Sequence, residues 1–309
     1  MRYSSNLRFS GFEVNPPPPI ANTCLFILKL KEDDKKTKFY LRYCLTINNY
    51  NTQCYNESMN SKILPELLNL SSQAGEIIMK LRENSFDYST KKDNTPVTRA
   101  DIASHEFLIN ALEKLTPDLP ILSEESSHIP FSVRKSWKKY WLIDPLDGTR
   151  DFIDGSPDFC ISIALIENNY PTFGLIYSPY NKVHYYRLAN EPSIKKINNE
   201  INKILTSKPK RWEKIVVGRY SNNNKGLKEH LKHKTNFETF KLGSALKFCL
   251  IAEGIYHYYP KFGRCSEWDT AAGVFILEGA GGRVVDFENK ALKFNATQDI
   301  ISPAFRATA

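Results

Sequence analysis

Apolar residues first recur at helical spacing after residue 59. In "MNSKILPELLNLSSQAGEIIMKLREN", which begins at Met59, they are three or four positions apart, and this spacing predicts an amphipathic helix. The stretch "TPVTRADIASHEFLINALEKL" predicts a second one, with Thr98 and Asp101 spaced as a capping box at its start. A folded domain is therefore expected to begin near Met59.

Short apolar runs separated by turn residues follow these helices and predict strands. The runs are "LPILSEE", "YWLID", "FCISIALIE" and "TFGLIYSP". Beyond a predicted loop at "LANEPSIKKINNE", strands are predicted at "KIVVGR", "IYHYYP" and "GRVVDF", and helices at "GLKEHLKH", "SALKFCLIAEG" and "WDTAAGVFILEGA". The pattern predicts a mixed α/β chain without internal repeats.

The first 58 residues have a different character. A proline tract, "NPPPPI", a mixed-charge run, "KEDDKKTKF", and an Asn-rich stretch, "INNYNTQCYNES", leave little that can bury a continuous apolar face. We therefore predict an N-terminal extension over residues 1–58, disordered or not part of the native protein, and a folded domain over residues 59–309. Met59 is a candidate start of translation.

Composition and charge narrow the class of protein. The chain of 309 residues is 41% hydrophobic, which is enough for a sizeable core, and its net charge of +8 favours an anionic partner. The basic residues form no stripe interleaved with aromatics, which argues against nucleic acid. The six cysteines show no CxxC pair or disulfide-like spacing, and no apolar run suits a membrane span or signal peptide. We therefore expect a cytoplasmic location.

The stretch "YWLIDPLDGTRDFI" gathers the first candidate site residues. Pro145 biases Asp144 toward extended geometry, so Asp144 is expected at the carboxyl end of a strand. Asp147 follows, Gly148 permits a tight turn, and Thr149 offers a hydroxyl at a helix start. Two carboxylates, a free backbone carbonyl and a hydroxyl suit a hard cation such as Mg²⁺. A surface Asp-Gly turn is the alternative, which the full order of residues disfavours.

Two neighbouring carboxylates repel each other, so a metal site needs further acidic residues elsewhere in the chain. Glu124 and Glu125 end a predicted strand, although adjacent glutamates are commonly solvated. Asp269 precedes a helix whose small first residues leave backbone N–H groups open to a phosphate, and Asp101 lies in the capping box. Helix capping is the alternative role for both aspartates.

Other patterns in the sequence give weaker evidence for a function. "GSALK" is not the GxxxxGK phosphate loop, and "GAGG" follows a helix, so it predicts a helix end and not a dinucleotide site. The histidines have no metal-ligand spacing and no Gly-x-Ser-x-Gly nucleophile elbow occurs, so serine, cysteine and zinc hydrolysis are poorly supported.

Taken in order, "SEES", "WLIDPLDGTRDFI" and "WDTAAG" resemble the lithium-sensitive, Mg²⁺-dependent phosphatases of the inositol monophosphatase superfamily. Further stretches, "NTPVTRADIASH", "LTPDLPILSEE", "GSALKFCLIAEG" and "YPKFG", are similar to its bacterial bisphosphate nucleotidases. The resemblance covers about residues 61–307 and implies nothing about the first 58. It implies an α/β fold, a layered α-β-α-β-α sandwich with halves at about 59–188 and 189–309.

The resemblance also implies a role for each matching residue. The implied metal ligands are Glu124, Asp144, Asp147, Asp269 and the backbone carbonyl of Leu146. Asp101 and Thr149 would orient and activate the attacking water. The implied substrate-binding residues are Glu124, Leu146, Asp147, Gly148, Thr149, Ser244, Lys247, Lys261 and Asp269.

Two departures from the family pattern are expected to bear on substrate preference. Glu267 stands beside the site in "GRCSEWD", and "FIDGSPDF" carries extra acidic residues. Neither removes an implied metal ligand.

The implied activity is removal of the 3′-phosphate of adenosine 3′,5′-bisphosphate, giving AMP and phosphate, with the sulfated nucleotide as a further substrate and a role in sulfur metabolism. The partner is then a small nucleotide bisphosphate. Peripheral association with the cytoplasmic face of the inner membrane is implied by the resemblance alone, and the sequence does not indicate an oligomeric state.

Two alternatives stay open. An inositol-monophosphate or sugar-bisphosphate phosphatase would share the metal core, which does not distinguish leaving groups. A noncatalytic polyanion-binding protein is disfavoured, because such a surface has no use for a carboxylate cluster.

Overall fold

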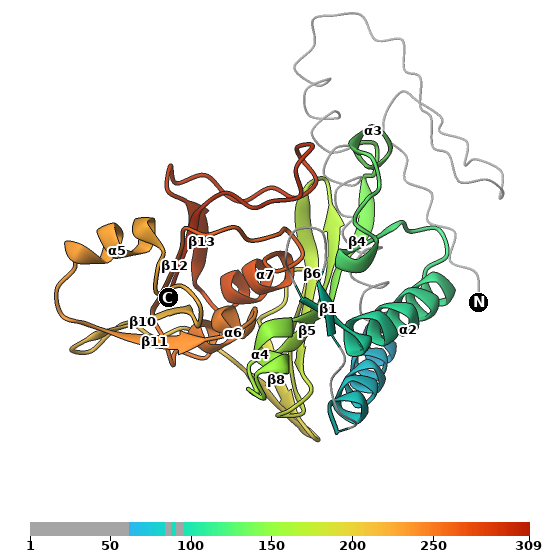
Figure 1. The fold of residues 1–309 in the computed structure, drawn as a ribbon, viewed down its shortest axis with the longest axis horizontal. Helices are drawn as coiled ribbons and strands as arrows, with labels where there is room; N and C mark the ends of the chain where they lie inside the picture. The colour runs from blue at the N-terminus through green and yellow to red at the C-terminus, as the bar shows by residue number, and fades with distance from the viewer. Residues whose placement is uncertain (1–61, 84–87, 91–95) are drawn as a thin grey trace, which may run out of the picture. The chain divides into compact units, whose positions relative to one another are not determined.

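The computed structural model describes residues 62–83, 88–90 and 96–309 (Figure 1). These residues all belong to one compact unit, Thr52–Ala309. The predicted extension over residues 1–58 lies outside the described residues, as does the start of the predicted domain at 59–61.

A seven-stranded sheet is the larger of two main sheets, with strand order β3-β4-β5-β6-β7-β8-β9. Its neighbours pair antiparallel except β3 and β4, which are parallel. The bounds are β3 (Ile121–Ser123), β4 (Lys139–Asp147), β5 (Cys160–Glu167), β6 (Tyr170–Ser178), β7 (Val183–Leu188), β8 (Ile194–Ile197) and β9 (Glu200–Lys203).

A five-stranded sheet is built from the second half of the chain, in the order β11-β10-β12-β14-β13. Strand β10 pairs parallel with both of its neighbours, and the other pairs are antiparallel. The bounds are β10 (Glu213–Gly218), β11 (Phe237–Leu242), β12 (Tyr258–Lys261), β13 (Arg283–Asp286) and β14 (Phe305–Thr308). Strands β1 (Tyr88–Thr90) and β2 (Pro96–Thr98) form a separate antiparallel pair.

Helices cover these sheets in three layers (Figure 1). A helix over residues 62–83 and α2 (Arg99–Leu115) pack on one face of the large sheet, where Leu67 and Leu108 meet Trp141. Between the two sheets lie α6 (Leu246–Ala252) and α7 (Ala271–Gly279), and α5 (Lys225–Lys232) covers the far face of the small sheet. The predicted α-β-α-β-α sandwich is confirmed.

The sequences of the central strands are continuous apolar runs because helices bury both faces of these strands. In β4, Trp141 faces the outer helices, whereas Leu142 faces the helices between the sheets. Helix α7 is buried from Ala271 to Leu277, since it has a sheet on either side. A Cβ on Gly174 would lie 2.8 Å from the backbone oxygen of Ala272, so this glycine lets α7 approach β6.

Two local predictions are corrected. The predicted loop at "LANEPSIKKINNE" contains β8 and the start of β9, a half-exposed hairpin whose charged residues lack an apolar strand pattern. Asp144 does not end its strand, because β4 continues through Pro145 to Asp147. The strand patterns also missed β7, β11 and β14.

The remaining elements are short: α3 (Phe131–Arg134), α4 (Thr149–Ile153) and a 3₁₀ turn at Glu124–Ser126. Among the described residues, no helix has both the length and the apolar character needed to cross a membrane.

Candidate active site

The end of β4 contains a β-bulge. Asp144 pairs with Ser162 and Asp147 pairs with Cys160, so three steps along β4 match two steps along β5. Residues three apart in a regular strand point to opposite faces, whereas one extra residue returns both to the same face. Asp144 and Asp147 accordingly line the same cleft. The Ser104 hydroxyl of α2 donates to the Pro145 carbonyl (2.9 Å) and holds the helix start against this bulge.

The turn after the bulge depends on a glycine. Gly148 has a φ of +95°, and a Cβ there would lie 2.9 Å from the backbone oxygen of Asp158. The predicted tight turn is confirmed, and Thr149 follows as the first residue of α4.

Asp101 and Thr149 come together, as the resemblance implies. The Thr149 hydroxyl donates to Asp101 Oδ1 (2.8 Å) and also lies 3.2 Å from the Leu146 carbonyl oxygen. The other oxygen, Oδ2, accepts hydrogen bonds from the backbone N–H (2.7 Å) and the hydroxyl (2.6 Å) of Thr98. The capping box therefore orients the same carboxylate that holds Thr149. Burial raises the pKa of Asp101 above its ordinary value.

Three carboxylates from separate elements form a compact group. Glu124, Asp144 and Asp269 each offer one oxygen, and these oxygens lie within 4.8 Å of one another. Burial, followed by repulsion among the carboxylates, raises the pKa of Asp144 well above its ordinary value and that of Asp269 to about 7. The backbone N–H of Ser266 (2.9 Å) and the thiol of Cys265 (3.4 Å) donate to Asp269 Oδ2.

Asp147 lies outside that group of three but lines the same cleft. Its Oδ2 accepts the backbone N–H of Ala245 and faces the thiol of Cys160 at 3.8 Å. Burial raises its pKa to about 6, and the nearby Lys247 ammonium opposes the shift. The two cysteines that support the site carried no sequence signal, since Cys160 lies in an apolar run and Cys265 in a polar stretch without a cysteine motif.

The residues present fit a hard divalent cation. The cleft has a volume of about 690 Å³, and its polar lining includes the group of three carboxylates together with Leu146, Asp147, Gly148 and Thr149. Carboxylates packed this closely repel unless positive charge lies among them, and an all-oxygen donor set is typical of Mg²⁺. Leu146 donates its N–H to Asp144 Oδ1 (3.0 Å), and the Leu146 carbonyl oxygen lies 3.2 Å from the Thr149 hydroxyl.

An adjoining cavity of about 440 Å³ contains the predicted nucleotide-binding residues Ser244, Lys247 and Lys261, and it shares Asp147 and Asp269 with the cleft. Lys247 is buried, and its Nζ donates to the carbonyls of Ser244 (2.5 Å) and Leu242 (3.3 Å). Burial lowers the pKa of Lys247. The lysine thus shapes the turn before α6, where Ser244 has a φ of +48°.

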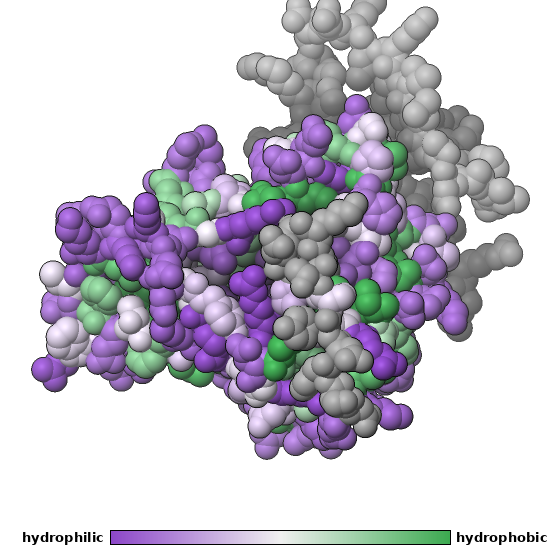
Figure 2. Space-filling model, viewed as in Figure 1, coloured by the Kyte–Doolittle hydropathy of each residue, from purple (hydrophilic) through white to green (hydrophobic). Residues whose placement is uncertain are grey.

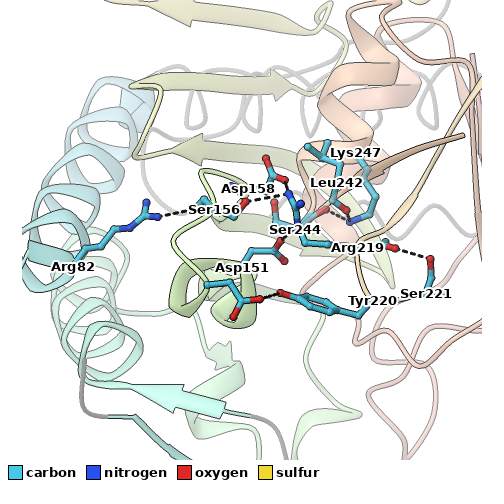
Figure 3. Close-up of polar contacts among 12 residues, drawn as sticks. Arg82, Asp151, Ser156, Asp158, Arg219, Tyr220, Ser221, Leu242, Ser244 and Lys247 are labelled. Carbon is cyan, nitrogen blue, oxygen red and sulfur yellow. Dashed lines mark hydrogen bonds and ion pairs between the residues drawn. The ribbon is translucent and has the colours of Figure 1, made fainter. Parts of the chain in front are cut away.

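The expectation for Glu267 is not supported. Its carboxylate is buried and accepts the backbone N–H of Asn295 (2.7 Å), and Glu267 lines neither cavity. The extra acidic residues of "FIDGSPDF" are held by a turn of the second half: Asp154 accepts the Tyr220 hydroxyl (2.6 Å), and Asp158 pairs with Arg219 (Figure 3). Sequence reasoning missed Arg219, which is a lone arginine after a strand.

The face of the molecule shown in Figure 2 is largely hydrophilic, with apolar residues scattered in small patches.

Comparison with known proteins identifies the family of the chain. Residues 59–308 match the inositol monophosphatase family. The chain belongs to this family. The 3′(2′),5′-bisphosphate nucleotidase CysQ of Salmonella typhimurium is 40% identical over 248 residues, covering 80% of this chain and 99% of that protein. The nucleotidase of the same name from Escherichia coli K12 is 38% identical with the same coverage.

Solved structures of the family agree with the fold. The crystal structure of CysQ from Bacteroides thetaiotaomicron matches with a TM-score of 0.67 at 31% identity, covering 78% of this chain and 94% of that one. An IMPase of Thermotoga maritima matches with a TM-score of 0.66 at 27% identity, covering 80% and 92% of the two chains. Inositol monophosphatase family enzymes are metal-dependent, and the acidic cluster of this chain suits that requirement.

Proposed function

We propose that this protein is a Mg²⁺-dependent 3′(2′),5′-bisphosphate nucleotidase, which hydrolyses the 3′-phosphate of adenosine 3′,5′-bisphosphate to give AMP and phosphate. The observation that most supports this proposal is the group of three carboxylates, Glu124, Asp144 and Asp269, in one cleft with the Asp101–Thr149 pair. The curated relatives with this printed activity share 33–40% identity with the chain.

The carboxylates of Glu124, Asp144, Asp147 and Asp269, with the Leu146 carbonyl, would hold the metal. When bound, Mg²⁺ supplies positive charge that polarises the phosphoryl oxygens, stabilises the leaving 3′-oxygen and lowers the pKa of a water. Burial raises the pKa values of Asp144, Asp147 and Asp269, and a bound cation would oppose this by favouring their charged forms.

Asp101 and Thr149 would orient the attacking water and take up its proton. The Thr149 hydroxyl is held by Asp101 Oδ1, so its oxygen is free to accept a hydrogen bond from water, and Asp101 is the proton acceptor behind it. The raised pKa of Asp101 makes it a stronger base than an exposed aspartate. No covalent enzyme intermediate is needed.

The adjoining cavity would take the nucleoside part of the substrate. Ser244, Lys247 and Lys261 line it beside the shared Asp147 and Asp269, so a leaving group there stays next to the reacting phosphate. The cavity's two lysines favour a ligand with a second anionic group. The sulfated nucleotide is proposed as a further substrate on the same ground.

A substrate panel tests the proposal. Initial rates are measured with Mg²⁺ on adenosine 3′,5′-bisphosphate, its sulfated derivative, inositol 1-phosphate and fructose 1,6-bisphosphate, and repeated with added Li⁺. We expect the highest kcat/KM on adenosine 3′,5′-bisphosphate and inhibition by Li⁺. A clear preference for the inositol or sugar substrate would assign the chain to the alternative phosphatase activity, and absence of all turnover would contradict the proposal.

A further inference from the structure

Arg219 connects the two halves of the molecule beside the active site. It follows β10 of the small sheet, and its guanidinium reaches the segment after β4 of the large sheet (Figure 3). Its Nε donates to Asp151 Oδ1 (2.6 Å), and its Nη2 donates to Ser156 Oγ (3.1 Å) and to Asp158 Oδ2. One side chain therefore contacts three residues within an eight-residue segment.

The contact to Asp151 acts directly on α4. That helix has only five residues and begins at Thr149, so its own hydrogen bonds hold it weakly. The Asp151 side chain is 5% exposed, and a buried carboxylate without its cation is strongly destabilising. The ion pair with Arg219 thus helps to hold the Thr149 helix in place, together with the buried Phe152 side chain and the hydrogen bond from Thr149 to Asp101.

The same carboxylate packs against the substrate-side turn. A Cβ on Gly243 would lie 2.5 Å from the Asp151 carboxyl group, so the Gly243 backbone rests directly on it. Two residues later, the backbone N–H of Ala245 donates to Asp147. Moving Asp151 would therefore disturb both sides of the reacting position: Thr149 on one side and the Asp147 contact on the other.

The opposite side of the segment is already anchored. Arg82, in the helix over residues 62–83, donates to the Ser156 carbonyl (2.9 Å), and its guanidinium lies over the rings of Phe152 (5.7 Å) and Phe159 (5.0 Å). Figure 3 shows Arg82 and Arg219 approaching from opposite sides. With Arg82 fixed on the outer layer, Arg219 supplies the restraint from the small sheet.

We propose that Arg219 is a positioning residue for phosphoryl transfer, which holds α4, and through it the Thr149 hydroxyl, in register with the carboxylates across the boundary between the two halves. The inference rests on the proposed function. Arg219 acts through Asp151 and Asp158 and not by contact with the reacting phosphate.

The test compares Arg219→Ala, Arg219→Lys and Asp151→Asn with the full-length parent enzyme. For Arg219→Ala we expect kcat on adenosine 3′,5′-bisphosphate to fall about 10-fold to 100-fold, since small misplacements of reacting groups have effects of this size. Arg219 lines the adjoining cavity, but its guanidinium is held by Asp151 and Asp158, so KM should stay within about threefold and the fall should lie in the chemical step. Arg219→Lys should be intermediate, since one ammonium lacks the fork that reaches two carboxylates.

A matched control comes from the other end of β10. Lys234 Nζ pairs with Glu213 at 2.6 Å, between two partly exposed side chains and at the end of the strand that is far from α4. Lys234→Ala should leave kcat and KM within about twofold of the parent values. Ethylguanidinium should restore part of the kcat of Arg219→Ala and should not raise that of the parent, which a general loss of stability would not reproduce.

Hydrogen exchange gives a readout that does not depend on activity. In Arg219→Ala we expect faster exchange of the Phe152 and Ser156 amides, which donate to Gly148 and Asp151 (both 2.9 Å), with no change in Lys234→Ala. If Arg219→Ala does not fold, Asp151→Asn, which removes the charge at nearly constant volume, is measured in its place.

The outcomes separate this inference from the proposed function. Unchanged kcat per folded molecule in Arg219→Ala, or a large rise in KM at constant kcat, overturns the positioning role while the nucleotidase assignment stands. If the parent enzyme hydrolyses none of the substrates, the proposed function fails, and unchanged exchange at α4 would still overturn the structural part of the inference.

Discussion

At the scale of single residues, the site depends on carboxylates that are buried close together. Asp144 and Asp269 repel each other and Glu124, and this repulsion adds to burial in raising the pKa of both aspartates. For Asp147, the Ala245 N–H and the Lys247 charge stabilise the charged carboxylate and so oppose the rise in its pKa. Such a cluster opposes folding by itself and is useful because a cation can bind it.

Asp147→Asn tests the role of one of these carboxylates. The amide oxygen can still accept the Ala245 N–H, so the fold should be retained, whereas the negative charge next to the phosphate is lost. We expect kcat to fall by at least about 1000-fold. Steady-state rates and circular dichroism on the same sample provide the measurement, and activity close to that of the parent would show that Asp147 is not part of the metal site.

His184 makes a pH-dependent contribution to stability. Its Nε2 lies 3.1 Å from both the Leu68 carbonyl oxygen and the Ser71 hydroxyl, and its ring stacks on Tyr177. Burial lowers its pKa to about 4, whereas histidine in an unfolded chain titrates at about 6.5. Between these pH values the side chain binds a proton in the unfolded state but not in the folded state. The contribution of His184 to stability is therefore complete above pH 6.5 and is lost as the pH falls toward 4.

We therefore expect this residue to lower the free energy of unfolding by about 2 kcal/mol between pH 7 and pH 5. Urea unfolding at the two pH values measures the difference, and His184→Gln should reduce it. His233 is exposed, so His233→Gln serves as the control and should leave the pH dependence as it is in the parent. Equal pH dependence in all three proteins would contradict the assignment.

At the scale of elements, the turn from β4 to α4 determines where Thr149 lies. The bulge brings Asp144 and Asp147 to one face, and Gly148 turns the chain at a φ of +95° so that α4 begins at the next residue. The capping box of α2 then brings Asp101 to the same point. The proposed catalytic pair, Asp101 and Thr149, is thus assembled from the starts of two helices.

Gly148→Ala should be more harmful than Gly155→Ala, because the two glycines differ in their surroundings. Both have positive φ, which disfavours alanine by about 1–2 kcal/mol. Only Gly148 has a neighbour close to the new Cβ, the Asp158 carbonyl at 2.9 Å, whereas a Cβ on Gly155 meets nothing within 4 Å. Thermal unfolding and kcat are measured for both, and we expect a marked loss of kcat for Gly148→Ala alone.

Equal effects of the two substitutions on stability and on rate would mean that backbone strain, and not the close approach of the Asp158 segment, is what the glycine relieves.

At the scale of the whole molecule, the cleft is lined by residues from distant parts of the chain. Asp144 lies in β4 of the large sheet and Glu124 in the 3₁₀ turn that follows β3, while Asp269 precedes α7, between the sheets. A bound cation would therefore link segments that are distant in sequence, and ligand binding to the folded state alone raises stability.

Mg²⁺ should accordingly raise the free energy of unfolding, by about 2.7 kcal/mol at a concentration 100 times its dissociation constant. Thermal unfolding is followed with and without Mg²⁺ at constant ionic strength, with Na⁺ as the control for general salt effects. Glu124→Gln and Asp144→Asn should lose most of the increase. A stabilisation that both variants retain would mean that the ion binds elsewhere.

Residues 1–58 are predicted to be unnecessary for activity. The family match begins at residue 59, and the Salmonella relative is covered over 99% of its length by 80% of this chain. A protein that begins at Met59 should keep kcat and KM within about twofold of the full chain. A larger loss would assign a role to the extension.

Much of the fold was predictable because the local pattern and the tertiary structure agree. Strands buried on both faces read as apolar runs, and Thr98 with Asp101 formed the predicted cap. The exceptions include the half-exposed or exposed strands β8, β9 and β11, whose charged residues carry no apolar pattern. Strands β7 and β14 were also missed, although they are largely or half buried. Among site residues, the acidic positions could be named from motifs, whereas Arg219 and the two supporting cysteines could not.

The sequence by itself determined the kinds of groups available: oxygen ligands, a glycine that permits the turn after β4, and a cap that orients Asp101. Only the tertiary structure decided how they meet. A bulge, set by pairing with β5, turns Asp144 and Asp147 to one face, and an arginine of the other sheet restrains the Thr149 helix. Pairing register and long-range ion pairs depend on partners distant in the chain, which no local pattern encodes.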